Sequence, residues 1–336
     1  MSDKTMVLNS LPAKTWHWLK MNEIKVPIEE SLYTQWESAA PVVIGAGENE
    51  ELTKMIHLTV EEGVSEADVF RLEAAKGATL SVTFVISSAA EAKATAMIRT
   101  DIRAQEDATV HIYLVQLAGD QVRVISQITG EAAARAKVVL TDLQLGGELS
   151  VDGAQIDLQG KESDFTADYA YLGQQERVLD INYVVNHYGK KTTSRMKANG
   201  VLRDSAKKIL RDTIDFKNGC IGAKASEVET VLLLGEKAIN QSIPLILCQE
   251  EDVEGDHGAT ISRVDDRTLF YLMSRGISRN EAENIIARSM IDAVAEEIPQ
   301  EKVRDLIRAY VKVAMPVERE KVELICDECD TKCLPD

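Results

Sequence analysis

Apolar and polar residues alternate through the long middle part of the chain. The runs at 78–86, 108–115 and 178–185 place an apolar side chain at about every second position, the period of a strand with one buried and one solvated face. Similar runs lie at 137–143, 154–158, 209–216 and 231–234. The pattern therefore predicts a domain built mainly from β-strands.

The spacing of these predicted strands restricts the fold. From the run that ends at Leu158 onward, their centres lie about 12 to 19 residues apart, with Gly, Asp or Asn between them. No intervening stretch has a helical period long enough for a βαβ crossover, which excludes a doubly wound sheet. A sandwich, a barrel or a β-solenoid remains. Strict sequence repetition is absent, but the aromatic content of 5% and the many Ala, Val, Ile and Leu residues suit the narrow interior of a solenoid.

Composition divides the chain into four parts. Residues 1–70 contain all three Trp residues and two short segments of helical character, at 14–20 and 29–36, interrupted by Pro27, so we predict an N-terminal helical region. Residues 71–264 form the strand-rich core, and residues 265–315 have the spacing of a C-terminal helical region. Residues 316–336 form an acidic tail that contains cysteines.

The C-terminal region carries clear signals for helix ends. Asp265 precedes an apolar run that stops at Gly276, as expected for an acidic start and a left-handed C-terminal residue. Ser278 and Glu281 have the spacing of a capping box, and Pro299 is placed to open a third helix. Helices in this position either cap the open end of a solenoid or offer a face to another protein, and the sequence leaves both alternatives open.

Charge and hydropathy exclude several classes of partner. The 336 residues include 38 Lys and Arg against 55 Asp and Glu, a net charge of −17, which disfavours a nucleic-acid partner. No stretch approaches the roughly 20 apolar residues of a membrane span, so we expect no membrane partner. The first ten residues lack the basic and apolar parts of a secretion signal, and we expect a cytoplasmic protein.

Several common chemical motifs are absent from the sequence. There is no Gly-x-x-x-x-Gly-Lys-Ser/Thr loop, and Gly45 and Gly47 lack the third glycine of a dinucleotide site, so we expect no nucleotide on this chain. Neither a Gly-x-Ser-x-Gly elbow nor a His-Glu-x-x-His motif is present, which leaves an ordinary hydrolase without support.

Two segments have residues suited to metal chemistry. His257 follows Asp256 between two glycines, where an imidazole and carboxylate oxygens could meet on one ion or form a charged hydrogen bond. Cys326, Cys329 and Cys333 have spacings that bring thiolates together on a soft metal or an iron–sulfur cluster, and the alternative is a tail with incidental thiols.

The remaining cysteines and two of the histidines lie in strand-like surroundings. We interpret Cys220 and Cys248 as small buried hydrophobic residues. We interpret His111 and His187 as satisfied or surface histidines rather than ligands.

A series of ordered motifs resembles a known family. The motifs are GVLRDSA at 200–206, RDTIDFKNG at 211–219, GAKA at 222–225, VLLL at 231–234, HGAT at 257–260 and LFYLMSRGI at 269–277. They resemble the core of the SufB/SufD family of iron–sulfur cluster assembly proteins, and TWHWLK at 15–20 resembles an N-terminal SufD segment. Residues 40–190 match only in general character, and the chain is shorter than most relatives.

The resemblance implies a fold and two kinds of partner. The fold is a right-handed parallel β-helix between helical ends, and the first partner is the ABC-type ATPase SufC, docked around Tyr271, Arg275 and Gly276. The second is another SufB/SufD-type subunit or a copy of this chain, paired through the β-helix, with a transient iron–sulfur cluster at the interface.

The resemblance also implies site residues for the cluster interface. The SufD histidine falls on His257, next to Asp256, and the SufB cysteine aligns with Glu229, so the chain is more similar to SufD than to SufB. Cys248 is near this region in sequence and is a candidate thiolate ligand. The terminal cysteines lie outside the family core.

Three hypotheses follow from the sequence. The leading one is a non-catalytic scaffold that acts with the SufC ATPase. The second is a homodimeric scaffold of a minimal system, which would bind the cluster itself through His257, carboxylates and the cysteine tail. The third is a β-helix polysaccharide lyase or hydrolase, which usually requires secretion and paired carboxylates or basic groups.

Overall fold

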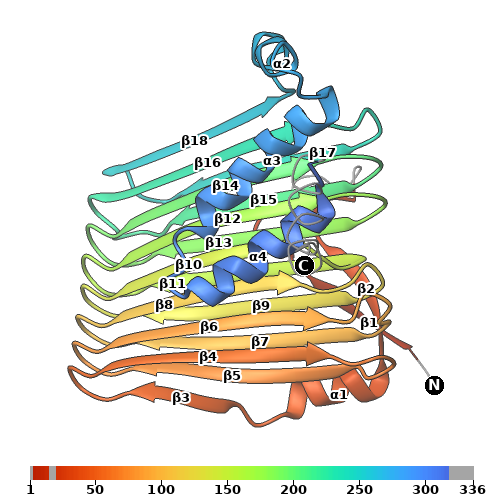
Figure 1. Ribbon diagram of the computed structural model, residues 1–336. Coiled ribbons are helices and arrows are strands. Elements are labelled where there is room, and N and C mark those ends of the chain that lie inside the picture. The colour runs from red at the N-terminus through yellow and green to blue at the C-terminus, as the bar shows by residue number, and fades with distance from the viewer. Residues whose placement is uncertain (1–2, 15–19, 318–336) are drawn as a thin grey trace, which may run out of the picture.

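The computed structural model describes residues 3–14 and 20–317, and its centre is a stack of two parallel eight-stranded sheets. Successive strands alternate between the sheets, so the chain winds as a β-solenoid of about eight turns (Figure 1). The first sheet contains β4 (Glu51–Val60), β6 (Thr79–Ser88), β8 (Thr109–Leu117), β10 (Lys137–Gln144), β12 (Asp164–Gly173), β14 (Thr193–Leu202), β16 (Ala223–Leu233) and β18 (Val253–Ser262). The second contains β3 (Val42–Ala46), β5 (Glu66–Ala74), β7 (Thr95–Ala104), β9 (Arg123–Ala132), β11 (Leu149–Leu158), β13 (Val178–His187), β15 (Lys207–Phe216) and β17 (Ile239–Cys248).

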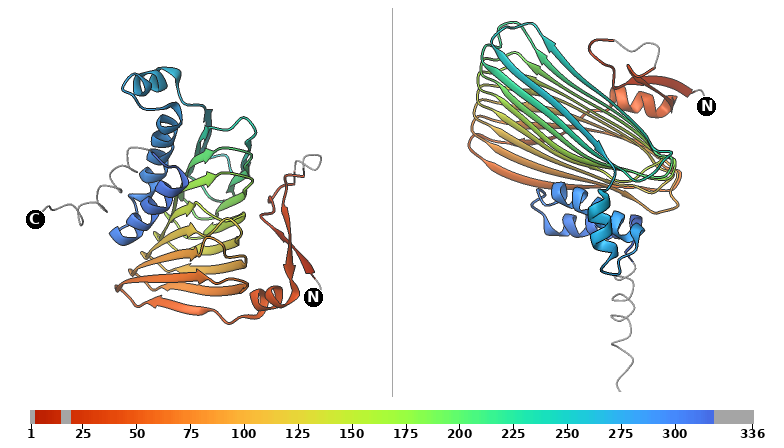
Figure 2. Two further views of the ribbon diagram at one scale, coloured as in Figure 1. Left: turned by 45° about the vertical axis from the view of Figure 1, so that its right-hand side comes forward. Right: turned by 90° about the horizontal axis from the view of Figure 1, so that it is seen from above.

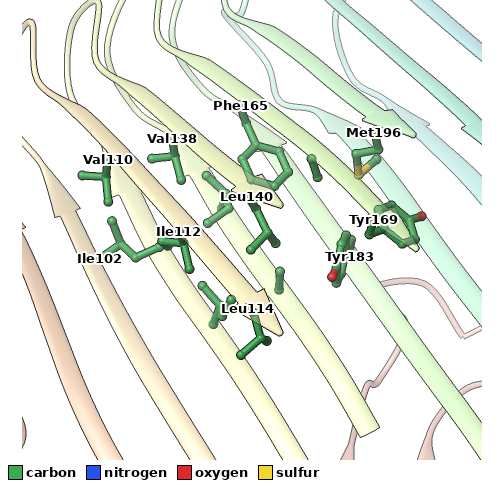
Figure 3. Packing of buried hydrophobic residues seen from close by; sticks show 14 of the residues in the cluster. Ile102, Val110, Ile112, Leu114, Val138, Leu140, Phe165, Tyr169, Tyr183 and Met196 are labelled. Atoms are coloured by element: carbon green, nitrogen blue, oxygen red, sulfur yellow. The ribbon is translucent and has the colours of Figure 1, made fainter. Parts of the chain in front are cut away.

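The interior of the solenoid is formed by side chains that point from each sheet toward the other. Parallel register places like positions in columns along the stack, for example Val110, Val138 and Phe165 in one column and Ile112 and Leu140 in the next. Figure 3 shows these residues packed between the sheets. Because a single turn cannot bury its apolar face alone, each turn is stabilised by the turns above and below it.

One corner of the solenoid is built from residues in the left-handed region. Asp107 (φ 60°), Arg135 (φ 56°), Glu162 (φ 60°) and Lys191 (φ 56°) each lie two residues before a strand of the first sheet. Such a conformation costs about 1 kcal/mol for a residue with a Cβ. The turns repeat every 27 to 31 residues, as the column Glu51, Thr79, Thr109, Lys137, Asp164, Thr193 and Lys224 shows.

An N-terminal hairpin lies along the outer face of the second sheet. β1 (Asp3–Leu8) and β2 (Ile24–Glu29) pair antiparallel, and α1 (Glu30–Ser38) follows directly. Apolar residues of these elements, including Trp36, pack against residues of β5, β7, β9 and β11. Figure 2 shows the hairpin beside the stack.

The C-terminal helices are α2 (Asp266–Met273), α3 (Arg279–Ala295) and α4 (Glu301–Ala314). α3 and α4 pack on the outer face of the first sheet, where Ile291 and Ile307 join a buried cluster with Val115, Leu143 and other residues of that sheet. The helices therefore cover a flank of the solenoid and do not cap its end (Figure 2). None of the described helices is long and apolar enough to span a membrane.

The structure confirms the mainly β solenoid and every strand predicted from alternation. It also confirms the helix ends: Asp265 caps α2, Gly276 has φ 80°, and Ser278 and Glu281 form the capping box of α3. The position of Pro299 differs slightly from the prediction, because this residue lies just before Gln300, the N-cap of α4, and not in the first turn of the helix.

The prediction of helical structure for residues 1–70 is wrong for most of that segment. Its only described helix is α1, whereas β1 to β4 and the first part of β5 occupy most of the remainder. Pro27 lies inside β2, which is possible because a two-stranded ribbon leaves one side of each strand without hydrogen bonds. Residues 15–19 of the predicted first helix lie outside the described residues.

Candidate functional site

The upper end of the solenoid is formed by one strand from each sheet. β17 and β18 are the last strands of their sheets, so within the described residues the outer edge of each meets no further strand. β18 is exposed over nearly its whole length, whereas β15 and β16, one turn below, are largely buried. We call this surface, made by β17 and β18, the open end.

His257 lies in the middle of β18 at the open end. Its register partner is Glu227 of β16, a buried residue whose side chain faces the interior. Register partners of parallel strands point to the same face, so His257 also faces inward, and it is exposed because no turn follows. Asp256, the preceding residue, therefore faces outward and is exposed.

Glu229 is one turn below the open end and is fully engaged by other side chains. Its Oε1 accepts hydrogen bonds from the Tyr171 hydroxyl at 2.7 Å and from the Lys208 ammonium, and its Oε2 accepts one from Ser242. Tyr171 comes from β12, so its ring crosses the level of β14 to reach Glu229. Gly200 makes this possible, because a Cβ there would lie 2.0 Å from Cζ of the Tyr171 ring.

The buried carboxylates near the open end outnumber the cations. Asp212, Glu227 and Glu229 surround one ammonium group, that of Lys208. Burial, together with repulsion from Asp212 and Glu229, raises the pKa of Glu227 to about 10, and burial raises the pKa of Asp212 to about 7. Burial also lowers the pKa of Lys208. Glu227 therefore holds a proton at neutral pH, and its Oε2 has no hydrogen-bond partner among the described residues.

A second acidic group lies deeper in the interior. The hydroxyl of Tyr183 contacts Oδ2 of Asp142 at 2.7 Å and Oδ2 of Asp152 at 2.6 Å. Burial raises the pKa of both carboxyl groups, that of Asp142 most strongly. The ring of Tyr169 lies 4.8 Å from that of Tyr183, and its hydroxyl bonds to Asp212, which links this group to the open end (Figure 3).

Cys248 ends β17 and lies on the same turn as His257. Contrary to the prediction of a buried residue, its thiol is exposed and contacts the carbonyl oxygen of Glu250 at 3.0 Å. It is exposed because β17 has no strand above it. Cys220 is buried, as predicted. His187 also matches its prediction, since both ring nitrogens contact hydroxyl groups, of Thr192 at 2.8 Å and of Ser194 at 3.0 Å.

The open end supplies individual metal ligands but not a complete metal site. His257 and Cys248 are the accessible nitrogen and sulfur donors, and Glu227, the register partner of His257, has one oxygen without a hydrogen-bond partner among the described residues. In the part of the chain that the structure describes, no three His, Cys, Asp or Glu side chains are grouped so that they could hold a metal ion. Cys326, Cys329 and Cys333 lie outside the described residues.

Helix α2 presents the other predicted site residues. Tyr271 is exposed, and the guanidinium of Arg275 lies 4.4 Å from the centre of its ring. Gly276, with φ 80°, ends the helix. Phe270 is 75% exposed and Met273 is also exposed, while Leu269 is the one buried residue of α2. Figure 1 shows α2 projecting above β18.

Sequence reasoning missed the interior polar residues of the open end. Lys208 and Asp212 lie on the same face of β15 as the buried Leu210. Charged residues at positions where the alternation predicts apolar ones are the signal that could have found them. In the middle of β16 the charged residues face inward and the apolar residue faces outward, since Glu227 and Glu229 are buried while Val228 between them is exposed.

Comparison with known proteins places these features in a family. Residues 57–290 match the family described as SUF system FeS cluster assembly, SufBD core domain. The iron–sulfur cluster assembly protein SufD of Bacillus subtilis is 33% identical over 141 residues, which are 42% of this chain and 32% of that protein. A SufBD family protein of Mycobacterium tuberculosis is 25% identical over 187 residues, 55% of this chain and 22% of that protein. A third relative, from Staphylococcus saprophyticus, is 27% identical over 168 residues, 50% of this chain and 36% of that protein. The match thus spans about a third or less of the length of the first two relatives.

Proposed function

Because the chain belongs to the SufBD family of iron–sulfur cluster assembly proteins, we propose that it is a scaffold subunit of a SUF assembly complex. In this proposal the solenoid pairs at its open end, α2 docks a SufC-type ABC ATPase, and the nascent cluster is cargo held where two subunits meet. The observation that carries the proposal is the open end itself, where His257 faces the interior on a last turn that nothing described covers.

The edge of β17 supports pairing at this end. Ile239 and Gln249 donate their backbone N–H groups downward, to Ala206 and Phe216. Donors alternate along a parallel strand, so the even-numbered residues of β17 direct their N–H groups toward the open side. An added strand would find donors there except at Pro244, which has no N–H group.

The chemistry of the open end supports a role in holding cargo. An exposed imidazole and an exposed thiol on one turn are ligands suited to iron. Since no complete set of ligands exists in the described residues, the remaining ligands would come from the second subunit. Glu229 is a poor candidate ligand, because three side chains already occupy its oxygens.

Helix α2 supports docking of an ATPase. Its exposed Phe270, Tyr271 and Met273 form an apolar surface beyond the packed helices, and Arg275 keeps the Tyr271 ring in place. The chain has no phosphate-binding loop, so ATP hydrolysis would be the task of this second protein.

Co-expression with a SufC-type ATPase tests the proposal. We expect the two proteins to co-purify and the ATPase activity to rise. If they neither co-elute nor affect ATP hydrolysis, the scaffold role is wrong. His257→Ala should leave the fold and the co-purification intact and abolish cluster maturation in cells. Loss of soluble protein would instead show that His257 is structural.

A homodimeric scaffold that binds the cluster itself is a second candidate, favoured by the exposed thiol of Cys248 at the open end. Anaerobic reconstitution with iron and sulfide separates the two. Visible absorption by the chain alone supports the homodimer, and its absence supports the SufD-like role with a different second subunit. If the homodimer binds the cluster, Cys248→Ser should remove this absorption.

A further inference from the structure

The end of the solenoid opposite His257 is a free strand edge. β4 and β3 are the first strands of their sheets, so within the described residues no strand pairs with their outer edges (Figure 1). Seven strand spacings of about 4.8 Å separate β4 from β18, so β4 lies roughly 34 Å from the open end. All residues of β4 except Val60 are at least partly exposed. We call the outer edge of β4 the lower edge.

The backbone of β4 alternates between bonded and free groups. Thr79 of β6, the register partner of Glu51, donates its N–H to the carbonyl oxygen of Glu50. In a parallel pair, the even-numbered residues of β4 then direct their N–H and C=O groups toward β6, and the odd-numbered residues direct theirs toward solvent. The lower edge therefore offers donors and acceptors at residues 51, 53, 55, 57 and 59. None of these residues is proline, so the row of donors is complete.

Acidic residues flank the lower edge at both ends of β4. Residues 47–51 and 61–68 contain no Lys or Arg. Their acids are Glu48, Glu50, Glu51, Glu61, Glu62, Glu66 and Asp68. Among the described residues none of these acids forms an ion pair, and Glu50 and Glu62 accept hydrogen bonds only from backbone N–H groups. The negative charge beside the lower edge is therefore not neutralised within the described chain.

A cavity of about 270 Å³ lies at the end of β4. β3 begins only at Val42, opposite the fifth residue of β5, so the start of β5 has no strand below it beside the cavity. The lining combines aliphatic residues, including Val60, with Glu61, Glu66 and Asp68. Burial, together with repulsion from Glu66, raises the pKa of Asp68. Such a lining suits a long cationic side chain, because its aliphatic stem can pack on the apolar residues while its charged head meets the carboxyl groups.

We propose that the lower edge binds an extended basic segment of another protein, which adds to the first sheet as a further strand and places a lysine or arginine in the cavity beside Asp68. Main-chain hydrogen bonds to the odd-numbered residues of β4 supply affinity, and the flanking acids supply the preference for a basic sequence. Lys54 is the one Lys or Arg of β4, so the middle of the bound segment should be uncharged. This surface is separate from the open end and from α2, so its occupant leaves both of them accessible.

A second copy of this chain fits the lower edge poorly. Two copies related by a two-fold axis would pair their β4 strands antiparallel. The glutamates that precede β4 in one copy would then lie beside Glu61 and Glu62 of the other, at both ends of the seam. Like charges across an interface oppose association, so the charge pattern selects a basic partner.

Two synthetic peptides of equal charge test the strand addition by fluorescence anisotropy with the full-length chain. Both carry two lysines at each end. Between them the first has six alternating valines and threonines, and the second has six alternating glycines and prolines, which cannot form a strand ladder. We expect the first peptide to bind at least about tenfold more tightly, because only it can add backbone hydrogen bonds. Equal dissociation constants, or no binding of the first peptide at millimolar concentration, would overturn the proposal.

Substitutions in the chain separate the edge from the cavity. Met55→Pro removes an outward N–H group without breaking a bond to β6, and it should weaken binding of the valine–threonine peptide at least about tenfold. Glu66→Gln with Asp68→Asn should weaken binding about tenfold. Glu131→Gln changes an exposed glutamate of β9, and as the matched control it should leave the dissociation constant unchanged. Undiminished binding by Met55→Pro contradicts the strand addition, and undiminished binding by the double variant contradicts the cation in the cavity.

Hydrogen exchange of the wild-type chain, followed by NMR, gives a test that needs no variant. The valine–threonine peptide should slow exchange at the amides of Thr53, Met55 and His57 and leave those of Leu52 and Lys54 nearly unchanged, because the latter already bond to β6. Unchanged exchange at the odd-numbered amides would overturn the proposal. Slow exchange there without peptide, increasing with protein concentration, would show that a second copy occupies the edge and would equally overturn it.

Discussion

Glu227 makes the stability of the solenoid depend on pH in an unusual direction. The residue is 4% exposed, and burial together with repulsion from two neighbouring carboxylates raises the pKa of its carboxyl to about 10. The native chain therefore binds a proton there that the unfolded chain releases near pH 4.5. A carboxyl whose pKa is raised on folding contributes stability that is complete below the unfolded pKa and is lost as the pH rises toward the folded pKa.

The size of the effect follows from linkage. Between pH 7 and pH 9 the native state holds one proton more than the unfolded state, so the free energy of unfolding falls by about 1.4 kcal/mol per pH unit, or roughly 3 kcal/mol in total. Lys208 acts in the opposite sense at the alkaline end, because burial lowers its pKa. The informative quantity is therefore the difference between the wild type and Glu227→Gln, which cannot lose this proton.

Urea unfolding followed by circular dichroism at pH 7, 8 and 9 measures this difference. The wild type should lose roughly 3 kcal/mol more stability over this range than Glu227→Gln. Glu254→Gln changes an exposed acid of the next turn, on β18, and should follow the wild type. Parallel stability curves for the wild type and Glu227→Gln would show that Glu227 is ionised in the folded chain, and the account of the buried charges would be wrong.

Three further substitutions test other parts of the structure. Gly200→Ala should lower the free energy of unfolding in urea by about 1–3 kcal/mol, because the added Cβ would meet the ring of Tyr171. The control Gly258→Ala has no atom near its added Cβ and should lower the free energy of unfolding by less than about 1 kcal/mol. Equal losses for the two variants would contradict the packing of Tyr171 against Gly200. Lys208→Met should lower the free energy of unfolding by about 3–5 kcal/mol, because it leaves the buried carboxylate of Glu229 without its cation. Adding Glu229→Gln to this variant should recover part of the lost stability. If the effects of the two substitutions are simply additive in a double-mutant cycle, the two side chains do not form the buried pair. Phe270→Ser should leave the unfolding midpoint unchanged and weaken co-purification of a SufC-type ATPase at least tenfold; undiminished binding would exclude α2 as the docking surface.

The strands could be predicted because their alternation reflects the burial of one face. The stacking of turns could not, because the residues at the corner that sets the repeat differ from one turn to the next. The left-handed corner position is Asn49, Gly77 and Gly222 in three turns but Asp107, Arg135, Glu162 and Lys191 in four others, so glycine or asparagine marks it in only some of the turns. The family resemblance supplied the solenoid where the pattern left a sandwich open.

The candidate site was predictable only in part. His257 was indicated both by its segment, where it follows Asp256 between two glycines, and by the resemblance, and the structure places it on the last turn. The engagement of Glu229 and the free oxygen of Glu227 depend on contacts between residues up to 58 positions apart, such as that with Tyr171, which no local pattern contains. In a strand where glutamate and apolar residues alternate, the glutamates normally lie on the solvated face. In the middle of β16 the glutamates lie on the buried face instead.

The exposure of β18 has a consequence for the timing of assembly. In a stack where each turn is held only by its neighbours, a terminal turn opens before the turns inside the stack, and the amide hydrogens of β18 should exchange with solvent faster than those of β16. Docking of another subunit would give that turn the missing neighbour. The turn that carries His257 would then be fully ordered only while two subunits remain together, so their separation would loosen the grip on the cargo and favour its delivery.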